Sequence, residues 1–68
     1  MEIKITTEYI KLQQALKFAG LVNMGSDAKA YILDGMVKVN GEVCLQRGKK
    51  LREGDIFEFD GKSCKVTI

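Results

Sequence analysis

Apolar residues recur at two different spacings along the chain, and each spacing predicts a different kind of element. Near the amino terminus residues 2–6 alternate, with Ile3 and Ile5 on one face, which predicts a short strand. Over residues 8–19 apolar side chains recur every three or four positions, which predicts an amphipathic helix. Gly20 follows this stretch directly and is typical of the residue that ends a helix.

A second, shorter helix is predicted between Ser26 and Gly35. Ser26 is the expected N-cap, and Asp27 places an acid in the first turn, where the helix dipole favours negative charge. Gly35 is expected to stop this helix. The apolar side chains that would then face inward are those of Ala28, Tyr31 and Ile32.

The second half of the chain alternates again and contains two turn signals. Asn40-Gly41, the strongest short-range hairpin signal, is predicted to join a strand at 37–39 to a returning strand at 43–45. Asp60-Gly61 is predicted to join the last two strands in the same way. The resulting order is β-α-α-β-β-β-β, an α+β fold in which two short helices pack on a small antiparallel sheet.

Composition limits the size and setting of this fold. A chain of 68 residues is expected to form one domain over residues 1–68, with a small core. No stretch approaches the ~20 apolar residues that span a bilayer, and the amino terminus lacks the apolar region of a signal peptide. We therefore expect a cytoplasmic monomer with no membrane partner.

Reactive and aromatic residues give little support for chemistry. The chain has no histidine, and its two cysteines, Cys44 and Cys64, lie far apart, so we expect no metal, no cofactor and two small apolar thiols on strand faces. No nucleophile has a base placed beside it in the sequence, so no enzyme activity is predicted. The aromatic residues are predicted to lie in the core: Tyr9, Phe18, Tyr31, Phe57 and Phe59.

Charge is distributed unevenly. Residues 1–37 are neutral, residues 38–52 carry +4 and residues 53–68 carry −2, which together give the net +2. Arg47, Lys49, Lys50 and Arg52 lie within seven residues just after the predicted hairpin. A turn that presents such a cluster is suited to a polyanion, although a solvated surface loop explains the same charges.

Several short segments occur along the chain in an order and spacing that are specific only when taken together. They are Ile10-Lys11-Leu12, Leu16-Lys17, Gly20-Leu21-Val22, Ser26-Asp27-Ala28-Lys29, Ile32 with Gly35, Val37-Lys38-Val39-Asn40-Gly41 and Leu51-Arg52-Glu53-Gly54-Asp55-Ile56. Over a core at residues 10–56 they resemble the alpha-L RNA-binding motif, the domain named after small-subunit ribosomal protein S-four, and the chain is most similar to the small stand-alone YaaA and YbcJ group.

This resemblance implies a non-enzymatic protein that binds structured RNA, with ribosomal RNA as the expected partner and ribosome assembly or quality control as the setting. Its RNA-facing surface would map to the following residues, with the basic segment alongside: Lys11, Lys17, Ser26, Lys29, Lys38, Asn40, Arg47, Lys49 and Lys50. The chain departs from the family pattern at Gln13, where Asp is usual, and at Gly25, where many members have Arg. The missing Arg removes a bidentate phosphate donor.

Two other functions fit parts of the sequence. A protein-interaction adaptor could use a sheet edge or the apolar loop Leu21-Val22-Asn23-Met24, and the lysines would then serve only solubility. A β-grasp sulfur carrier fits poorly, because such proteins end in Gly-Gly whereas this chain ends in Val66-Thr67-Ile68.

Overall fold

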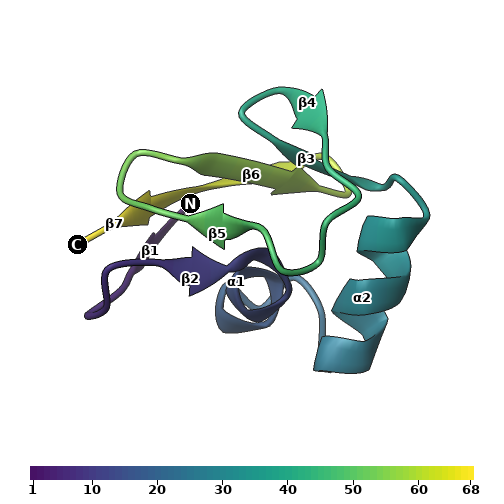
Figure 1. Ribbon diagram of the computed structural model, residues 1–68, viewed down its shortest axis with the longest axis horizontal. Helices are drawn as coiled ribbons and strands as arrows, with labels where there is room; N and C mark the ends of the chain where they lie inside the picture. Colours follow the sequence, from purple (N-terminus) through teal and green to yellow (C-terminus); the bar gives the residue numbers. More distant parts are fainter.

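Strands from both ends of the chain meet in one five-stranded sheet in the computed structural model, which describes residues 1–68 (Figure 1). The sheet order is β1-β7-β6-β3-β4, and β2 pairs with β5 in a separate two-stranded ribbon. In chain order the elements are β1 (Glu2–Lys4), β2 (Ile10–Lys11), α1 (Leu12–Phe18), α2 (Gly25–Leu33), β3 (Val37–Val39), β4 (Glu42–Val43), β5 (Lys50–Leu51), β6 (Ile56–Phe59) and β7 (Lys62–Thr67).

The predicted α+β class is confirmed, but the sheet is mixed rather than antiparallel. β1 lies parallel to β7, with Ile3 opposite Val66, whereas the other neighbours run antiparallel. A tight turn fixes the relative direction only of the two strands that it joins. β1 and β7 are the first and last strands of the chain, so no turn joins them. Turn signals therefore could not reveal the parallel pair.

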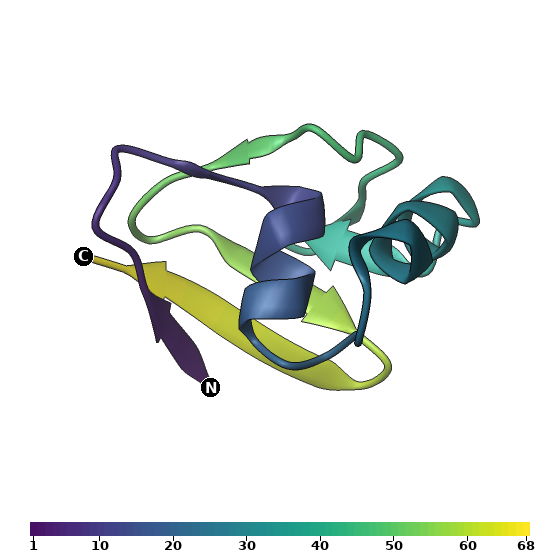
Figure 2. The ribbon, with the colours of Figure 1, turned by 90° about the horizontal axis from the view of Figure 1, so that it is seen from below.

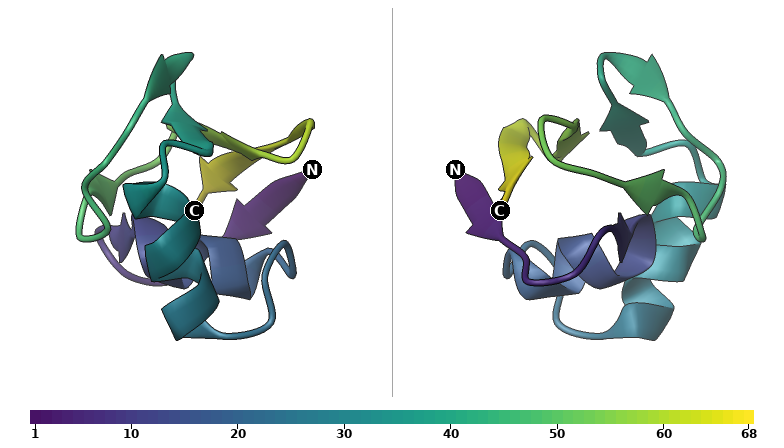
Figure 3. Two further views of the ribbon diagram at one scale, coloured as in Figure 1. Left: turned by 90° about the vertical axis from the view of Figure 1, so that its right-hand side faces the viewer. Right: turned by 60° about the vertical axis from the view of Figure 1, so that its left-hand side comes forward.

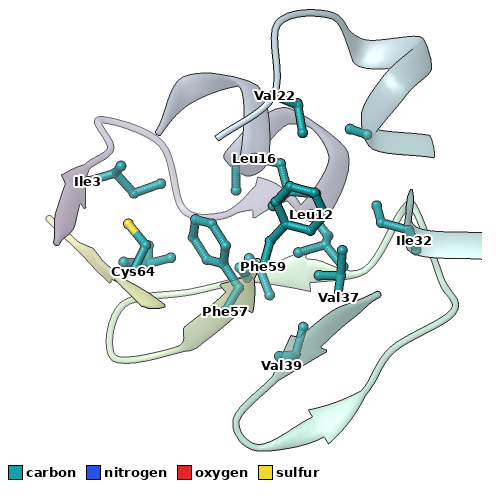
Figure 4. Packing of buried hydrophobic residues seen from close by; sticks show 14 of the residues in the cluster. Ile3, Leu12, Leu16, Val22, Ile32, Val37, Val39, Phe57, Phe59 and Cys64 are labelled. Carbon is teal, nitrogen blue, oxygen red and sulfur yellow. The ribbon is translucent and has the colours of Figure 1, made fainter. Parts of the chain in front are cut away.

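Both helices lie on one side of the sheet and bury its inner face (Figures 2 and 3). The core consists of 15 buried residues, all of them apolar. Figure 4 shows side chains from the sheet, such as Val37 and Phe57, converging with Leu12 and Leu16 of α1. Alternation along β3 places Val37 and Val39 inward and Lys38 outward.

Glycines end both helices as predicted. Gly20 and Gly35 have φ of 75° and 77°, a left-handed conformation that glycine adopts without a Cβ clash. The Leu21 N–H donates to the Leu16 carbonyl at 3.0 Å, and the Met36 N–H donates to the Tyr31 carbonyl at 3.1 Å. Each of these hydrogen bonds closes a loop of six residues, which is the Schellman motif. Residues next to each helix end therefore determine where the helix stops.

The starts of both helices differ from the predictions. α1 begins at Leu12 instead of residue 8, because Ile10 pairs with Leu51 in the β2–β5 ribbon. α2 begins at Gly25 with Met24 as its N-cap, and no side chain caps it. The prediction of Ser26 as N-cap is therefore wrong, since the Met24 carbonyl accepts the first helical bonds.

Both two-residue turns are confirmed, but the first hairpin is shorter than predicted. Asn40 and Gly41 have φ of 52° and 86°, as a type I′ turn requires. The returning strand ends at Val43, and Leu45 lies beyond it with 57% of its surface exposed. The chain leaves the sheet there because residues 47–49 are bound to the start of α1.

A polar clamp that the sequence did not reveal joins the two hairpins. The Asn40 side chain donates to Asp55 Oδ1 at 3.2 Å and accepts the Ile56 N–H at 3.0 Å. The other Asp55 oxygen accepts the Arg52 N–H at 2.8 Å. Asn40 thus fixes the position of the turn that leads into β6.

The cysteines and aromatic residues follow the core prediction only in part. Cys64 is buried on β7, and burial raises the pKa of its thiol; Cys44 is half-buried and lies outside any strand. Phe57 and Phe59 are buried, and Tyr31 packs on Phe59 with ring centroids 4.7 Å apart. Phe18 is 61% exposed, so the prediction that it lies in the core is wrong.

No helix in the structure has the length and apolar character needed to cross a membrane.

The clamp predicts a difference between two turn residues of equal conformation. Asn40→Ala removes two hydrogen bonds and places Ala at positive φ, so we expect the free energy of unfolding to fall by about 2–3 kcal/mol. Asp60 occupies the same position of the other turn at φ 54°, without such a clamp. Asp60→Ala should therefore cost only about 1 kcal/mol. Denaturant unfolding measures both values, and equal losses would refute the role of the clamp.

Candidate nucleic-acid interface

Three of the predicted binding residues meet in one polar pocket between the helices. Lys17 near the end of α1 faces Ser26 and Lys29 in the first turns of α2 across a pocket of about 380 Å³. The remaining lining residues are Gln13, Gln14 and Gly25, so no acidic or apolar side chain lines it. We call it the helix pocket. Two ammonium groups, two amides and a hydroxyl match the hydrogen-bonding needs of a phosphate.

The amino end of α2 forms one wall of the helix pocket. Asp27 and Ala28 direct their N–H groups to the Met24 carbonyl at 3.1 and 3.2 Å, whereas no hydrogen bond within the protein uses the N–H groups of Gly25 and Ser26. The positive end of the helix dipole adds to the charges of Lys17 and Lys29. A Cβ at position 25 would meet nothing within 4 Å, so this wall is open to solvent.

A second basic cluster lies at the β2–β5 ribbon. Lys11 and Lys50 are directly opposite each other, and both are exposed. Like charges in such a pair repel each other. Lys50 Nζ also lies 4.9 Å from the centroid of the Tyr9 ring, and the Arg52 guanidinium carbon lies 6.0 Å from it. The ribbon therefore concentrates cations around one half-buried aromatic ring.

Backbone hydrogen bonds hold residues 47–49, which precede β5, against the start of α1. The N–H groups of Leu12 and Gln13 donate to the carbonyls of Lys49 and Arg47 at 2.8 and 3.1 Å. The backbone of Arg47 and Lys49 is thereby fixed at the start of α1, and both side chains are exposed. The sequence predicted this cluster from charge alone, but it could not predict the attachment.

Two predicted residues are placed elsewhere. Lys38 projects from the outer face of the sheet, where its cross-strand neighbours are Val43 and Glu58. Asn40 lines a groove of about 600 Å³ together with Lys49, and this groove also includes Glu42 and several apolar residues. The structure thus does not bring Lys38 to the helix pocket, and the Asn40 side chain is occupied by the Asp55 clamp.

Sequence reasoning missed the glutamines of the site. Gln13 and Gln14 both line the helix pocket, and Gln14 Oε1 also accepts the Lys11 N–H at 3.3 Å. Gln14 lies on the exposed helix face between Lys11 and Lys17, so helical spacing could have identified it. No group of three or more His, Cys, Asp or Glu residues in the structure could hold a metal ion.

Comparison with known proteins gives one family. Residues 3–67 match the model of the S4 domain. Over 59 residues the chain is 42% identical to the probable ribosome maturation protein RlbA of Bacillus subtilis, with 87% of this chain and 83% of the relative covered. It is 34% identical over 59 residues to the putative RNA-binding protein YbcJ of Escherichia coli, with coverages of 87% and 84%.

The solution structure of YbcJ from Escherichia coli has the same fold. It superposes with a TM-score of 0.76 at 29% identity, and the match covers 98% of this chain and 86% of YbcJ. That structure is described as an alfaL motif involved in RNA-binding. The resemblance inferred from the sequence landmarks is confirmed.

The opposed lysines of the ribbon predict a gain in stability when one charge is reversed. Lys11→Glu replaces a repulsive cross-strand pair with an attractive one and places an acid at the start of α1, so we expect about 0.5–1 kcal/mol of added stability. Lys4→Glu is the matched control, because Lys4 lies opposite the neutral Thr67 in the sheet. Thermal unfolding at low salt measures both variants. Equal shifts in Tm would mean that net charge, and not the pair, causes the effect.

Proposed function

Because the chain belongs to the S4 domain family of RNA-binding modules, we propose that it binds structured RNA, specifically ribosomal RNA, as a non-enzymatic factor in ribosome assembly or quality control. The helix pocket carries this proposal, since it gathers Lys17, Lys29 and the free N–H groups of α2 without any acidic lining residue. Such a pocket is suited to an RNA phosphate.

The cluster at the ribbon supplies a second phosphate contact. Lys11 and Lys50 repel each other in the free protein, and an RNA phosphate between them would relieve the repulsion. Gln14 lies between this cluster and the helix pocket, because it lines the helix pocket and bonds to Lys11. The two sites therefore form one surface that follows α1 and could contact consecutive phosphates of a folded RNA.

Gly25 gives this surface a distinct chemistry. Where many family members have Arg, this chain exposes a backbone N–H next to Lys29. Lysine ammonium groups act as point charges, without the bidentate geometry of Arg. Binding is therefore expected to depend strongly on salt and weakly on the exact orientation of each phosphate.

The name of the relative RlbA supports the ribosomal setting, since that protein is a probable ribosome maturation protein. The adaptor alternative receives less support. In the loop at 21–24, Val22 is buried and Leu21 packs against the core, so Met24, 60% exposed, is the one apolar side chain that this loop offers to a partner.

Alanine variants test the proposed surface. Lys17→Ala combined with Lys29→Ala should weaken binding to a ribosomal RNA fragment and reduce the slope of log affinity against log salt by about 0.7–0.9 for each lost phosphate contact. Lys4→Ala combined with Lys65→Ala removes the same charge from the sheet, where both residues alternate with buried neighbours. Titrations at several salt concentrations give both slopes. Equal losses in the two double variants would mean that the surface is assigned to the wrong face.

Crosslinking in cells tests the RNA partner. Ultraviolet crosslinking of the protein, followed by sequencing of the attached RNA, should recover ribosomal RNA at a few defined positions. The Lys17→Ala, Lys29→Ala variant should lose those positions while remaining folded. Crosslinks spread over messenger RNA, or none above background, would contradict the ribosomal assignment.

A further inference from the structure

A second pocket lies on the neighbouring face of α1 and contains aromatic side chains. Its volume is about 520 Å³, and its lining residues are Thr7, Tyr9, Ile10, Lys11, Gln14 and Phe18. We call it the aromatic pocket. Gln14 lines both this pocket and the helix pocket, so the two are adjacent on the surface. None of the functions assigned above uses Phe18 or Tyr9.

Core packing does not explain the position of Phe18. α1 buries Leu12, Ala15 and Leu16 on its inner face, while Phe18 is 61% exposed on the outer one. Gln14 and Phe18 are one helical turn apart and form the side of the pocket that α1 contributes, and Lys11, the residue just before α1, extends this side. An aromatic ring exposed at a helix end, with a half-buried Tyr9 in the same pocket, offers a flat apolar surface to a ligand.

The charges around the aromatic pocket indicate what kind of ligand it fits. Its lining includes Lys11 and no acidic residue, and Lys50 and Arg52 lie over the Tyr9 ring. A flat, uncharged ring attached to a polyanion matches both features. Nucleobases stack on aromatic side chains whatever their identity, and nearby cations strengthen this contact. An apolar peptide would match the rings but not the cations.

We propose that the aromatic pocket binds one unpaired nucleobase, stacked on Phe18, while the helix pocket holds a phosphate of the same strand. This inference rests on the proposed RNA-binding function and makes it more specific. The preferred substrate is a folded RNA with a looped-out or bulged nucleotide next to a helical stem. Gln14, with its amide N–H groups free, lies where it can contact either the base or the adjoining phosphate.

Two RNAs of equal charge test this proposal. One is a stem-loop RNA, and the other is the same stem-loop in which every loop nucleotide is abasic. The wild-type protein should bind the RNA with bases roughly tenfold or more tightly, because base stacking on an aromatic residue contributes at this level. Phe18→Ala should remove the preference without changing the salt slope. Leu33→Ala is the control, since Leu33 is also an exposed apolar helix residue but lies on α2.

A fluorescent variant reports stacking directly. The chain has no tryptophan, so Phe18→Trp introduces a single indole at the proposed stacking position. Its fluorescence should be quenched by the stem-loop with bases and left nearly unchanged by the abasic one. Phe18 is exposed, so both substitutions should leave the fold intact, which circular dichroism verifies.

The outcomes separate this inference from the proposed function. If the wild type binds both RNAs equally, or if Phe18→Ala behaves as Leu33→Ala does, the base site is refuted and phosphate binding stands. If the wild type binds neither RNA, the RNA-binding function itself fails for this class of ligand. A protein partner is the remaining outcome. If RNA-free ribosomal proteins bind the wild type and do not bind Phe18→Ala, the pocket belongs to a protein partner and the inference is overturned.

Discussion

The arrangement of this protein depends on how the first turn of α1 satisfies its backbone donors. A helix leaves its first N–H groups without partners inside the helix, and a Ser, Thr, Asp or Asn side chain commonly supplies one. Here the Lys49 and Arg47 carbonyls accept the N–H groups of Leu12 and Gln13. These two N–H groups are therefore bonded only because a segment from the second half of the chain lies against the helix. The same hydrogen bonds hold the backbone of the basic residues Arg47 and Lys49 at the start of α1.

The region around α1 also contains two features that do not favour stability on their own. Lys11 opposes Lys50 across the ribbon, and Phe18 exposes most of its ring although the core holds only 15 buried residues. A small domain has little stability in reserve, so unfavourable contacts of this kind are informative. Lys11 and Phe18 line the aromatic pocket together, on the exposed side of α1. The opposite side of the same helix follows the ordinary rules and buries Leu12, Ala15 and Leu16.

Local chemistry determined which parts of the structure were predictable from sequence. Gly20, Gly35 and the two type I′ turns act through their own backbone conformation, so the helix ends and the hairpin turns were predicted correctly. The start of α1, the β2–β5 ribbon and the parallel pairing of β1 depend on residues distant in sequence. For the site, Lys17, Ser26 and Lys29 meet as the family resemblance implies, while Lys38 projects from the other face. Phe18 borders the apolar stripe of its helix, so periodicity alone assigned it to the core.

Gly25, at a position where the family resemblance implies Arg in many members, bears on how the proposed surface could discriminate between RNAs. An Arg fork fixes the direction from which a phosphate is approached, whereas lysine ammonium groups accept many directions. In the proposed function, a surface of lysines and backbone N–H groups would hold the RNA backbone without reading its geometry closely. Selectivity then has to come from another contact that only some RNA shapes can make. The aromatic pocket, which shares Gln14 with the helix pocket, would supply this contact in the proposed complex, because a paired base inside a stem cannot reach Phe18 and a looped-out base can.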